Sequence, residues 1–202
     1  MRTKINHSRT NTPKGFGQVR IIGGQFRRTM IAVPTFEGLR PSSDRVRETV
    51  FNWMAHQWGG VFEGKKILDA FAGSGAFGLE CVSRGSRDVV FVDTFAPAVA
   101  AIKTTLTKWQ TPADVRANDV SVVLGQLAKT ATTFDWIILD PPFGKGWLAA
   151  IVPLATQLAH NDTWLYVEIE AGGDLSTLTQ NGWEMIREGK TAQVYYGLYA
   201  RP

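Results

Sequence analysis

Short apolar segments alternate with amphipathic segments along most of this chain of 202 residues, from Lys66 onward. Short apolar runs favour strands, whereas apolar residues that recur every three or four positions favour helices. Strands separated by helices predict a mostly parallel sheet with helices on both faces. The expected strands are Lys66–Ala70, Asp88–Asp93, Ala113–Ala117, Phe134–Leu139 and Thr163–Glu168, and the expected helices are Ala76–Arg84, Ala96–Trp109, Val120–Lys129 and Trp147–His160.

The pattern changes near the C-terminus. Two strand-like segments, Trp183–Arg187 and Val194–Ala200, flank the turn-like residues 188–190. This arrangement predicts an antiparallel hairpin, because a glycine between two alternating segments favours a turn. The hairpin brings the predicted sheet to seven strands. We therefore expect an α/β fold of the Rossmann-like class, with a small N-terminal β-hairpin and helix extension.

The positive charge is concentrated at the N-terminus. The first 47 residues hold ten Lys and Arg against two acidic residues, a balance of +8, whereas the other 155 hold twelve against sixteen, a balance of −4. Such a segment can attract a polyanion by neutralising phosphates, although a solubilising tail has the same composition. We predict a disordered basic tail over residues 1–17, an RNA-binding extension over 18–60 and a catalytic domain over 61–202.

The predicted extension begins with a hairpin over Val19–Val33, around Gly23 and Gly24. A helix follows, capped by Ser42 or Ser43. Its expected apolar face is Val46, Val50, Trp53 and Met54, which leaves Arg45, Glu48 and Asn52 to point elsewhere. The candidate RNA contacts are Arg20, Arg27, Arg28, Arg40, Arg45 and Arg47; a solvated helix start is the other interpretation of the last three.

Cysteine and histidine provide no functional cluster. The single cysteine, Cys81, falls in a predicted helix and is expected to be a buried thiol in a reducing compartment. The three histidines are scattered, so we expect no metal site. The sequence shows no long apolar run and no signal-peptide pattern, so we expect a cytoplasmic protein that does not enter membranes.

A glycine-rich loop follows the first expected strand of the catalytic domain. Gly73, Gly75 and Gly78 satisfy G-x-G-x-x-G, which lets the backbone turn tightly and approach a cofactor closely. Nicotinamide and flavin proteins share this pattern. Asp69, four residues before Gly73, favours another cofactor, because a carboxylate repels a pyrophosphate and attracts the α-ammonium of S-adenosylmethionine. We therefore expect S-adenosyl-L-methionine on this loop, with Phe71 among the cofactor-binding residues.

Two further aspartates follow the next strands. Asp93 ends the second strand, where a doubly wound sheet offers a carboxylate to ribose hydroxyls. Asp119 follows the third strand and is expected to accept a hydrogen bond from the adenine amino group. An ordinary helix N-cap is the alternative interpretation of Asp119.

The segment Asp140-Pro141-Pro142-Phe143 follows the fourth strand and provides the candidate catalytic residues. The exocyclic nitrogen of a base is a poor nucleophile, because its lone pair is delocalised into the ring. Acceptors must therefore hold its protons and direct it toward a methyl donor. Asp140 and the Pro141 carbonyl suit this task, and Phe143 suits stacking on the base.

Five motifs in order resemble the RsmD family of bacterial 16S rRNA guanine-N2 methyltransferases, over about nine-tenths of the chain. They are Arg20-Ile-Ile-Gly-Gly, Leu39-Arg-Pro-Ser-Ser-Asp-Arg-Val-Arg-Glu, Asp69-Ala-Phe-Ala-Gly-Ser-Gly, Phe91-Val-Asp93 and Asp140-Pro-Pro-Phe143. The resemblance implies a class I methyltransferase that binds the cofactor on Asp69, Gly73, Gly75, Asp93 and Asp119. It also implies N2 methylation of a specific guanine, position 966 in the conventional rRNA numbering, within a small-subunit assembly particle. Where the family usually has Arg-Gly-Arg or Arg-Gly-Lys, this chain has Arg27-Arg-Thr29.

Two other functions remain open from the sequence. A DNA or other RNA base amino-methyltransferase is one, although DNA enzymes usually carry a target-recognition insertion for which this chain has no room. A non-catalytic RNA-binding assembly factor is the other, and it would be expected to have lost Asp69 or the Asp140–Phe143 segment. The expected partners are 16S rRNA and the small ribosomal subunit or its assembly intermediate, bound by a monomer.

Overall fold

The protein was analysed as a computed structural model, which describes residues 17–34 and 43–201. Its main sheet has seven strands in the order β5-β4-β3-β6-β7-β9-β8. The strands are β3 (Lys66–Asp69), β4 (Asp88–Asp93), β5 (Asp114–Ala117), β6 (Phe134–Leu139), β7 (Ala159–Glu170), β8 (Glu184–Lys190) and β9 (Val194–Ala200). Strands β3 to β7 are parallel, and β8 and β9 form the antiparallel end. The predicted fold class is confirmed.

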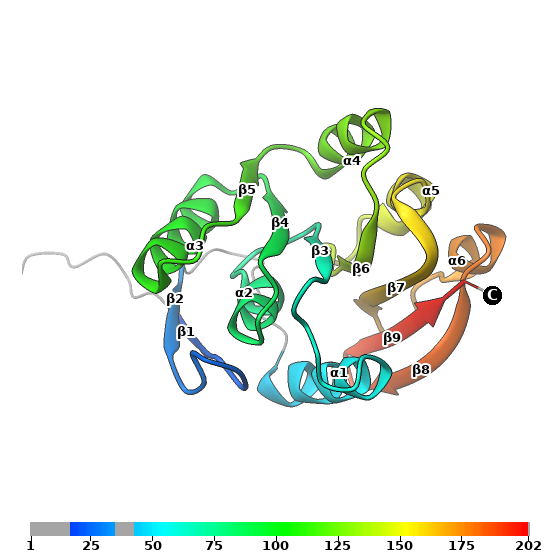
Figure 1. Cartoon of the computed structure of the whole chain (residues 1–202). Helices are drawn as coiled ribbons and strands as arrows, with labels where there is room; N and C mark the ends of the chain where they lie inside the picture. Colours follow the sequence, from blue (N-terminus) through cyan, green and yellow to red (C-terminus); the bar gives the residue numbers. More distant parts are fainter. Residues whose placement is uncertain (1–16, 35–42, 202) are drawn as a thin grey trace, which may run out of the picture.

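Helices cover both faces of this sheet (Figure 1). On one face lie α1 (Asp44–Gln57), α2 (Ala76–Ser83) and α3 (Ala96–Trp109), and on the other lie α4 (Val120–Lys129), α5 (Trp147–Thr156) and α6 (Ser176–Gln180). Successive side chains of a strand point to opposite faces. Ile67 accordingly packs with α1 and α2, whereas Leu68 packs with α4 and α5.

The N-terminal extension shares a core with the main sheet. Strands β1 (Gly17–Arg20) and β2 (Met30–Val33) form the predicted hairpin, and Ser43 caps α1 by accepting a hydrogen bond from the Val46 amide. Val19 and Ile31 from the hairpin are buried in the same cluster as Phe51 of α1 and Trp136 of β6. The extension is therefore packed onto the catalytic fold rather than built around a core of its own.

The hairpin docks on the C-terminal end of α2. The fully buried Glu80 carboxylate accepts hydrogen bonds from the Ile22 and Gly23 amides, each at 2.7 Å, and from Nε of Arg84 at 2.9 Å. Next to it, Gly24 lies against the backbone of Ser83. These contacts satisfy a buried charge that would otherwise be costly. Glu80 is a structural residue that sequence reasoning missed.

Two expectations for the C-terminal half were wrong in detail, and one helix was missed. The helix expected over Trp147–His160 ends at Thr156, because Ala159 already pairs with Phe134 at the start of β7. The short helix α6 was not predicted. Residues 188–190 lie within β8 rather than in a turn, because they pair with residues 195–197 of β9. A β-carbon on Gly189 would meet the Tyr196 ring at 2.3 Å. This glycine permits a close approach between paired strands.

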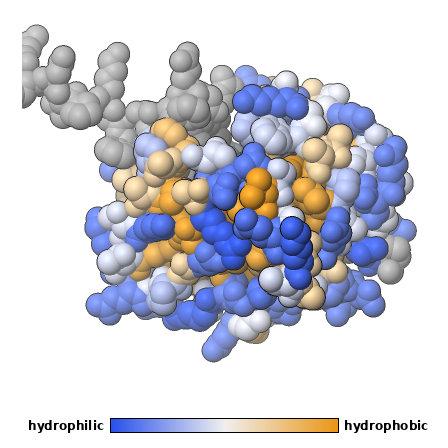
Figure 2. Space-filling view, turned by 90° about the horizontal axis from the view of Figure 1, so that it is seen from above, coloured by the Kyte–Doolittle hydropathy of each residue, from blue (hydrophilic) through white to orange (hydrophobic). Residues whose placement is uncertain are grey.

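The surface above α4 and α5 is mostly hydrophilic, with several apolar patches between polar side chains (Figure 2). Isolated exposed apolar residues, such as Val122 of α4, are ordinary on soluble surfaces. Among residues 17–34 and 43–201, no helix is long and apolar enough to cross a membrane. The same residues contain no group of three or more His, Cys, Asp or Glu able to hold a metal ion. Cys81 is buried and forms no disulfide.

Candidate active site

Three neighbouring strands place their functional residues along one edge of the sheet. Asp69 of β3 pairs with Phe91 of β4 on one side and with Ile138 of β6 on the other. Two residues further along, Asp93 ends β4 and Asp140 follows β6, so these two carboxylates flank β3 at similar height. The chain leaves β3 toward β4 and β5, then returns to β6 on the opposite side. Such a reversal forms the crevice in which α/β sheets bind ligands.

The glycine loop runs from β3 into α2. Gly75 adopts a left-handed conformation (φ +75°) and forms the N-terminal cap of α2. A β-carbon on Gly78 would lie 2.2 Å from Cε1 of Phe91, so this glycine allows the helix to pack on β4. The N-terminus of α2, with its amide groups and partial positive charge, therefore faces the crevice.

Asp93 fixes this loop. One carboxylate oxygen accepts a hydrogen bond from the Gly73 amide at 2.6 Å, and the other accepts one from the Phe95 amide at 2.7 Å. Each oxygen has two lone pairs, so the side chain can still accept from hydroxyl groups. The position fits the predicted contact with a ribose.

Asp69 lies beneath the loop and is only 2% exposed. Burial raises the pKa of this carboxyl to about 7, against the opposing hydrogen bond that Gly78 donates at 2.9 Å and with a further upward contribution from the negative charge of Asp93. A nearby cation would favour the charged form. The carboxylate therefore favours a ligand with an ammonium group, although it also has the structural task of holding Gly78.

Asp119 caps α4. Its carboxylate accepts hydrogen bonds from the Ser121 amide at 2.8 Å and the Val122 amide at 3.4 Å, and it also contacts the Ser121 hydroxyl. The hydroxyl contact is the main cause of its lowered pKa. The alternative interpretation as an N-cap is thus observed, and the contact with adenine stays a prediction.

The segment after β6 projects at the same edge. Asp140 is half-buried, Pro141 is buried and Phe143 is 40% exposed. The Gly144 amide donates a hydrogen bond of 3.0 Å to Oε1 of Glu170 at the end of β7, which fastens the segment to the sheet. Phe143 thus presents an accessible ring three residues after the half-buried Asp140.

The sequence analysis did not identify two residues of β7 that lie near Asp140. The pairing of Leu139 with Val167 places Glu168 beside Asp140, and the buried Tyr166 hydroxyl donates to Oε2 of Glu168 at 2.7 Å. Burial raises the pKa of Tyr166 well above its ordinary value, and the charge of Glu168 adds to this. An acidic residue inside an apolar strand was the available signal.

A cavity of about 400 Å³ adjoins Pro141 and Pro142 on the side of α5 and α6. Trp147 and Glu170 contribute to its wall, and the Phe71 ring packs edge-on against Trp147 at 5.8 Å between centroids. Phe71 is therefore tied to α5 as well as to the glycine loop. The cavity wall does not include the glycines of that loop.

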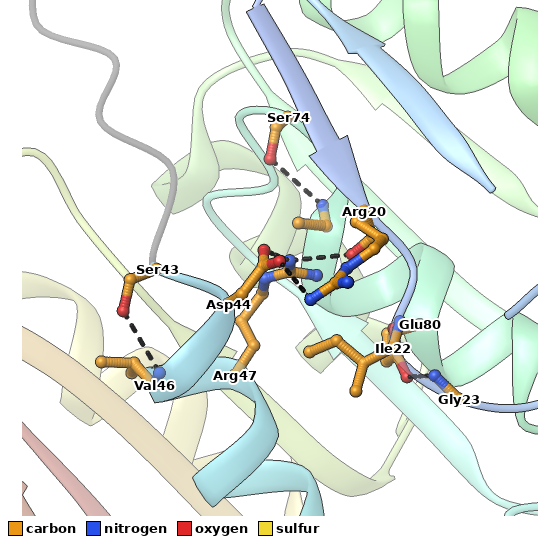
Figure 3. Close-up of polar contacts among 10 residues, drawn as sticks. Arg20, Ile22, Gly23, Ser43, Asp44, Val46, Arg47, Ser74 and Glu80 are labelled. Atoms are coloured by element: carbon orange, nitrogen blue, oxygen red, sulfur yellow. Dashed lines mark hydrogen bonds and ion pairs between the residues drawn. The ribbon is translucent and has the colours of Figure 1, made fainter. Parts of the chain in front are cut away.

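The candidate RNA contacts divide into three groups. Arg27, Arg28 and Arg45 are exposed, and Arg20 is exposed while paired with Asp44 at 3.2 Å. Arg40 lies outside the described residues. Arg47 is fully buried and bonded within the protein (Figure 3), so the prediction that it contacts RNA at the surface was wrong. The stacking of Phe26 on Trp109, with centroids 4.1 Å apart, holds the exposed arginines of the hairpin tip over α3.

Comparison with known proteins identifies the relatives of this fold. A family described as "Conserved hypothetical protein 95" matches residues 19–200. The chain belongs to this family. A relative in Escherichia coli strain K12, ribosomal RNA small subunit methyltransferase D, is 38% identical over 98% of this chain and 94% of its own length. The resemblance drawn from the five motifs is confirmed, as is the expectation of a methyltransferase.

Solved structures of other proteins have a similar fold. The Escherichia coli protein yhhF has a TM-score of 0.78 and 34% identity, covering 92% of this chain and 98% of its own. The T. thermophilus 16S rRNA N2 G1207 methyltransferase (RsmC), in complex with AdoMet and guanosine, has a TM-score of 0.71 and 18% identity, covering 93% of this chain and 50% of its own. The second likeness shows the fold.

Proposed function

We propose that this protein transfers the methyl group of S-adenosylmethionine to the exocyclic N2 of one guanine in 16S rRNA. The name of the Escherichia coli relative supports a small-subunit rRNA substrate, and the complex of RsmC supports this cofactor and base on this fold. We place the reaction in the cytoplasm, on a small-subunit assembly particle.

The observation that carries the proposal is that β3 and β6 are adjacent, parallel strands. The glycine loop follows β3, and Asp140 follows the adjacent β6, so a cofactor on the loop and a base at Asp140 lie within one crevice. When bound, S-adenosylmethionine supplies an electrophilic methyl group on a sulfonium. Asp140 and the Pro141 carbonyl accept hydrogen bonds from the amino group and direct its lone pair to that carbon.

Asp140 has a second role in the proposal, which is to help remove a proton from the methylated nitrogen. As the new N–C bond forms and the S–C bond breaks, the nitrogen becomes positively charged and must lose a proton. A carboxylate in hydrogen-bond contact stabilises that charge and can take the proton on its way to solvent. Phe143 stacks on the guanine and fixes its plane.

The cofactor residues follow from the loop geometry. Asp69 attracts the ammonium, Gly73 and Gly75 allow the backbone to approach, Asp93 accepts from the ribose hydroxyls and Asp119 accepts from the adenine amino group. The donor set fits this cofactor, because a carboxyl with a pKa raised by burial gains most from a cation placed beside it.

The test uses the purified protein with S-adenosylmethionine and small-subunit particles from a strain that lacks the enzyme. Nucleoside mass spectrometry should find N2-methylguanosine. Asp140→Asn should lower turnover by about 10²–10⁴ with nearly unchanged cofactor affinity. Phe143→Ala should weaken RNA binding by about 1–3 kcal/mol, and Phe143→Tyr should retain most of it.

Other products would contradict the proposal. N6-methyladenosine, or methylation of duplex DNA in preference to RNA, would indicate another substrate. Cofactor and RNA binding without turnover on any of these substrates would indicate an assembly factor.

A further inference from the structure

Arg47 of α1 is fully buried and only partly satisfied. Its Nη2 donates to the backbone carbonyl of Arg20 at 2.9 Å and to Oδ1 of Asp44 at 2.6 Å. Its Nε and Nη1 are also buried, and neither has a hydrogen-bond partner in the structure. A guanidinium stays protonated and has five N–H donors, so leaving two of its nitrogens unpaired inside a protein is costly. An anionic ligand would remove that cost.

The hairpin contacts locate this guanidinium relative to α2. The chain runs in the same direction as the helix, because Ile22 and Gly23 lie at Glu80 whereas Gly24 lies at Ser83. Arg20 is two to three residues before that Glu80 contact, about 8 Å of extended chain, which equals roughly five residues of helix. The Arg20 carbonyl, and with it the tip of Arg47, therefore lies near the level of the glycine loop.

The close-up includes the glycine loop. Figure 3 shows Ser74 in the same part of the structure as Arg20, Asp44 and Arg47, with no drawn hydrogen bond joining Ser74 to them. The N-terminus of α2 begins just after Ser74, and its partial positive charge adds to that of Arg47. The level of the Arg20 carbonyl along α2 therefore places Arg47 toward the same end of the helix as this partial positive charge.

The cofactor has one anionic group, a carboxylate, that would pair with the guanidinium of Arg47. The methionine part of S-adenosylmethionine carries an ammonium and a carboxylate on the same carbon. If the ammonium lies at Asp69, the carboxylate must lie within a few ångströms of it and needs donors. We propose that Arg47 binds this carboxylate through one of its unpaired N–H groups, an inference that rests on the cofactor assigned above.

An ion pair at the surface lies next to Arg47. Asp44 links the buried Arg47 to the exposed Arg20, whose Nη2 lies 3.2 Å from Oδ2 of Asp44. The side chains of Arg20 and Asp44 are 56% and 44% exposed. The exposed Arg20–Asp44 pair is weak, whereas the 2.6 Å pair between Asp44 and the buried Arg47 is costly to break, so the ligand carboxylate leaves Asp44 on Nη2 and binds Nε or Nη1.

The test compares two ligands by calorimetry: S-adenosylhomocysteine and its analogue without the carboxyl group. The wild-type protein should bind S-adenosylhomocysteine about tenfold to a hundredfold more tightly than the analogue. Arg47→Met should lose that difference by weakening only S-adenosylhomocysteine. Arg47→Lys, which keeps the charge, should lose less. Arg87→Met, at an exposed arginine before β4, is the matched control and should change neither affinity.

Each alternative has its own result. Equal binding of the two ligands by the wild-type protein would overturn the proposal even if Arg47→Met failed to fold. Equal weakening of both ligands in Arg47→Met would show that Arg47 only supports the fold. If the wild-type protein bound neither ligand, the assigned cofactor itself would be wrong.

Discussion

Gly24 and Ser83 are in backbone contact: a β-carbon on Gly24 would lie 1.9 Å from the Ser83 carbonyl oxygen. Gly24 also has a positive φ of +74°, which disfavours any other residue. This contact, with the Glu80 carboxylate beside it, seats the N-terminal hairpin on α2. The glycine pair in the sequence therefore marks a docking point as well as a turn.

Gly24→Ala should lower the free energy of unfolding by about 3 kcal/mol, because it adds a backbone clash to the strain of a left-handed alanine. Gly60→Ala is the matched control. Its φ is +80° and a β-carbon there would meet nothing within 4 Å, so it should cost about 1 kcal/mol. Urea unfolding measures both. Equal losses would mean that the hairpin moves away from α2 without cost.

Cofactor binding should depend on pH through Asp69. Its pKa is raised to about 7 in the folded protein, so the neutral form is favoured there and its contribution to stability is lost as pH rises from about 4 through 7. A ligand with an ammonium group needs the ionised form. Affinity for S-adenosylhomocysteine should therefore be roughly eightfold weaker at pH 6 than at pH 7.5. A flat profile for wild type, or the same slope in Asp69→Asn, would remove Asp69 from this role.

Asp119→Ser separates the two interpretations of Asp119. Serine is a good N-cap, so the melting temperature should change little. The shorter, neutral side chain cannot reach an adenine amino group, and affinity for S-adenosylhomocysteine should fall about tenfold. Unchanged affinity would leave Asp119 as a helix cap alone.

Arg27→Glu tests the hairpin as an RNA-binding element. The salt dependence of RNA binding should flatten by about one unit of slope for each phosphate that the variant no longer neutralises, while cofactor affinity stays constant. Lys129→Glu makes the same change of charge at the exposed end of α4, on the other face of the sheet from the hairpin, and should have a smaller effect. Similar slopes for the two variants would show that net charge alone matters.

The spacing of apolar residues predicted the helices and strands in which buried positions recur regularly. The ends of β4, α3, α4 and β6 agree with the sequence reading to the residue, because apolar positions and capping or turn residues coincide there. Gly189 was misread as a turn, since a glycine needed for close packing under Tyr196 looks the same in a sequence.

The sequence motifs predicted the part of the candidate site that lies at the ends of the parallel strands. Asp69, Asp93 and Asp140 are brought to one edge, as parallel strands require. The burial of Arg47 was not predicted. This residue lies four positions before the buried Phe51, on the inward face of α1, but charged residues are rarely buried and the sequence gives no sign of the Arg20 carbonyl that receives it.

Helix α2 has eight residues and is about 12 Å long. One end begins at the glycine loop and the other supports the basic hairpin, so this helix acts as a spacer of fixed length between the two. Inserting one residue into it would rotate the hairpin by about 100° and advance it by about 1.5 Å relative to the loop. The distance between the cofactor loop and the basic hairpin is therefore fixed by the number of residues in this one helix.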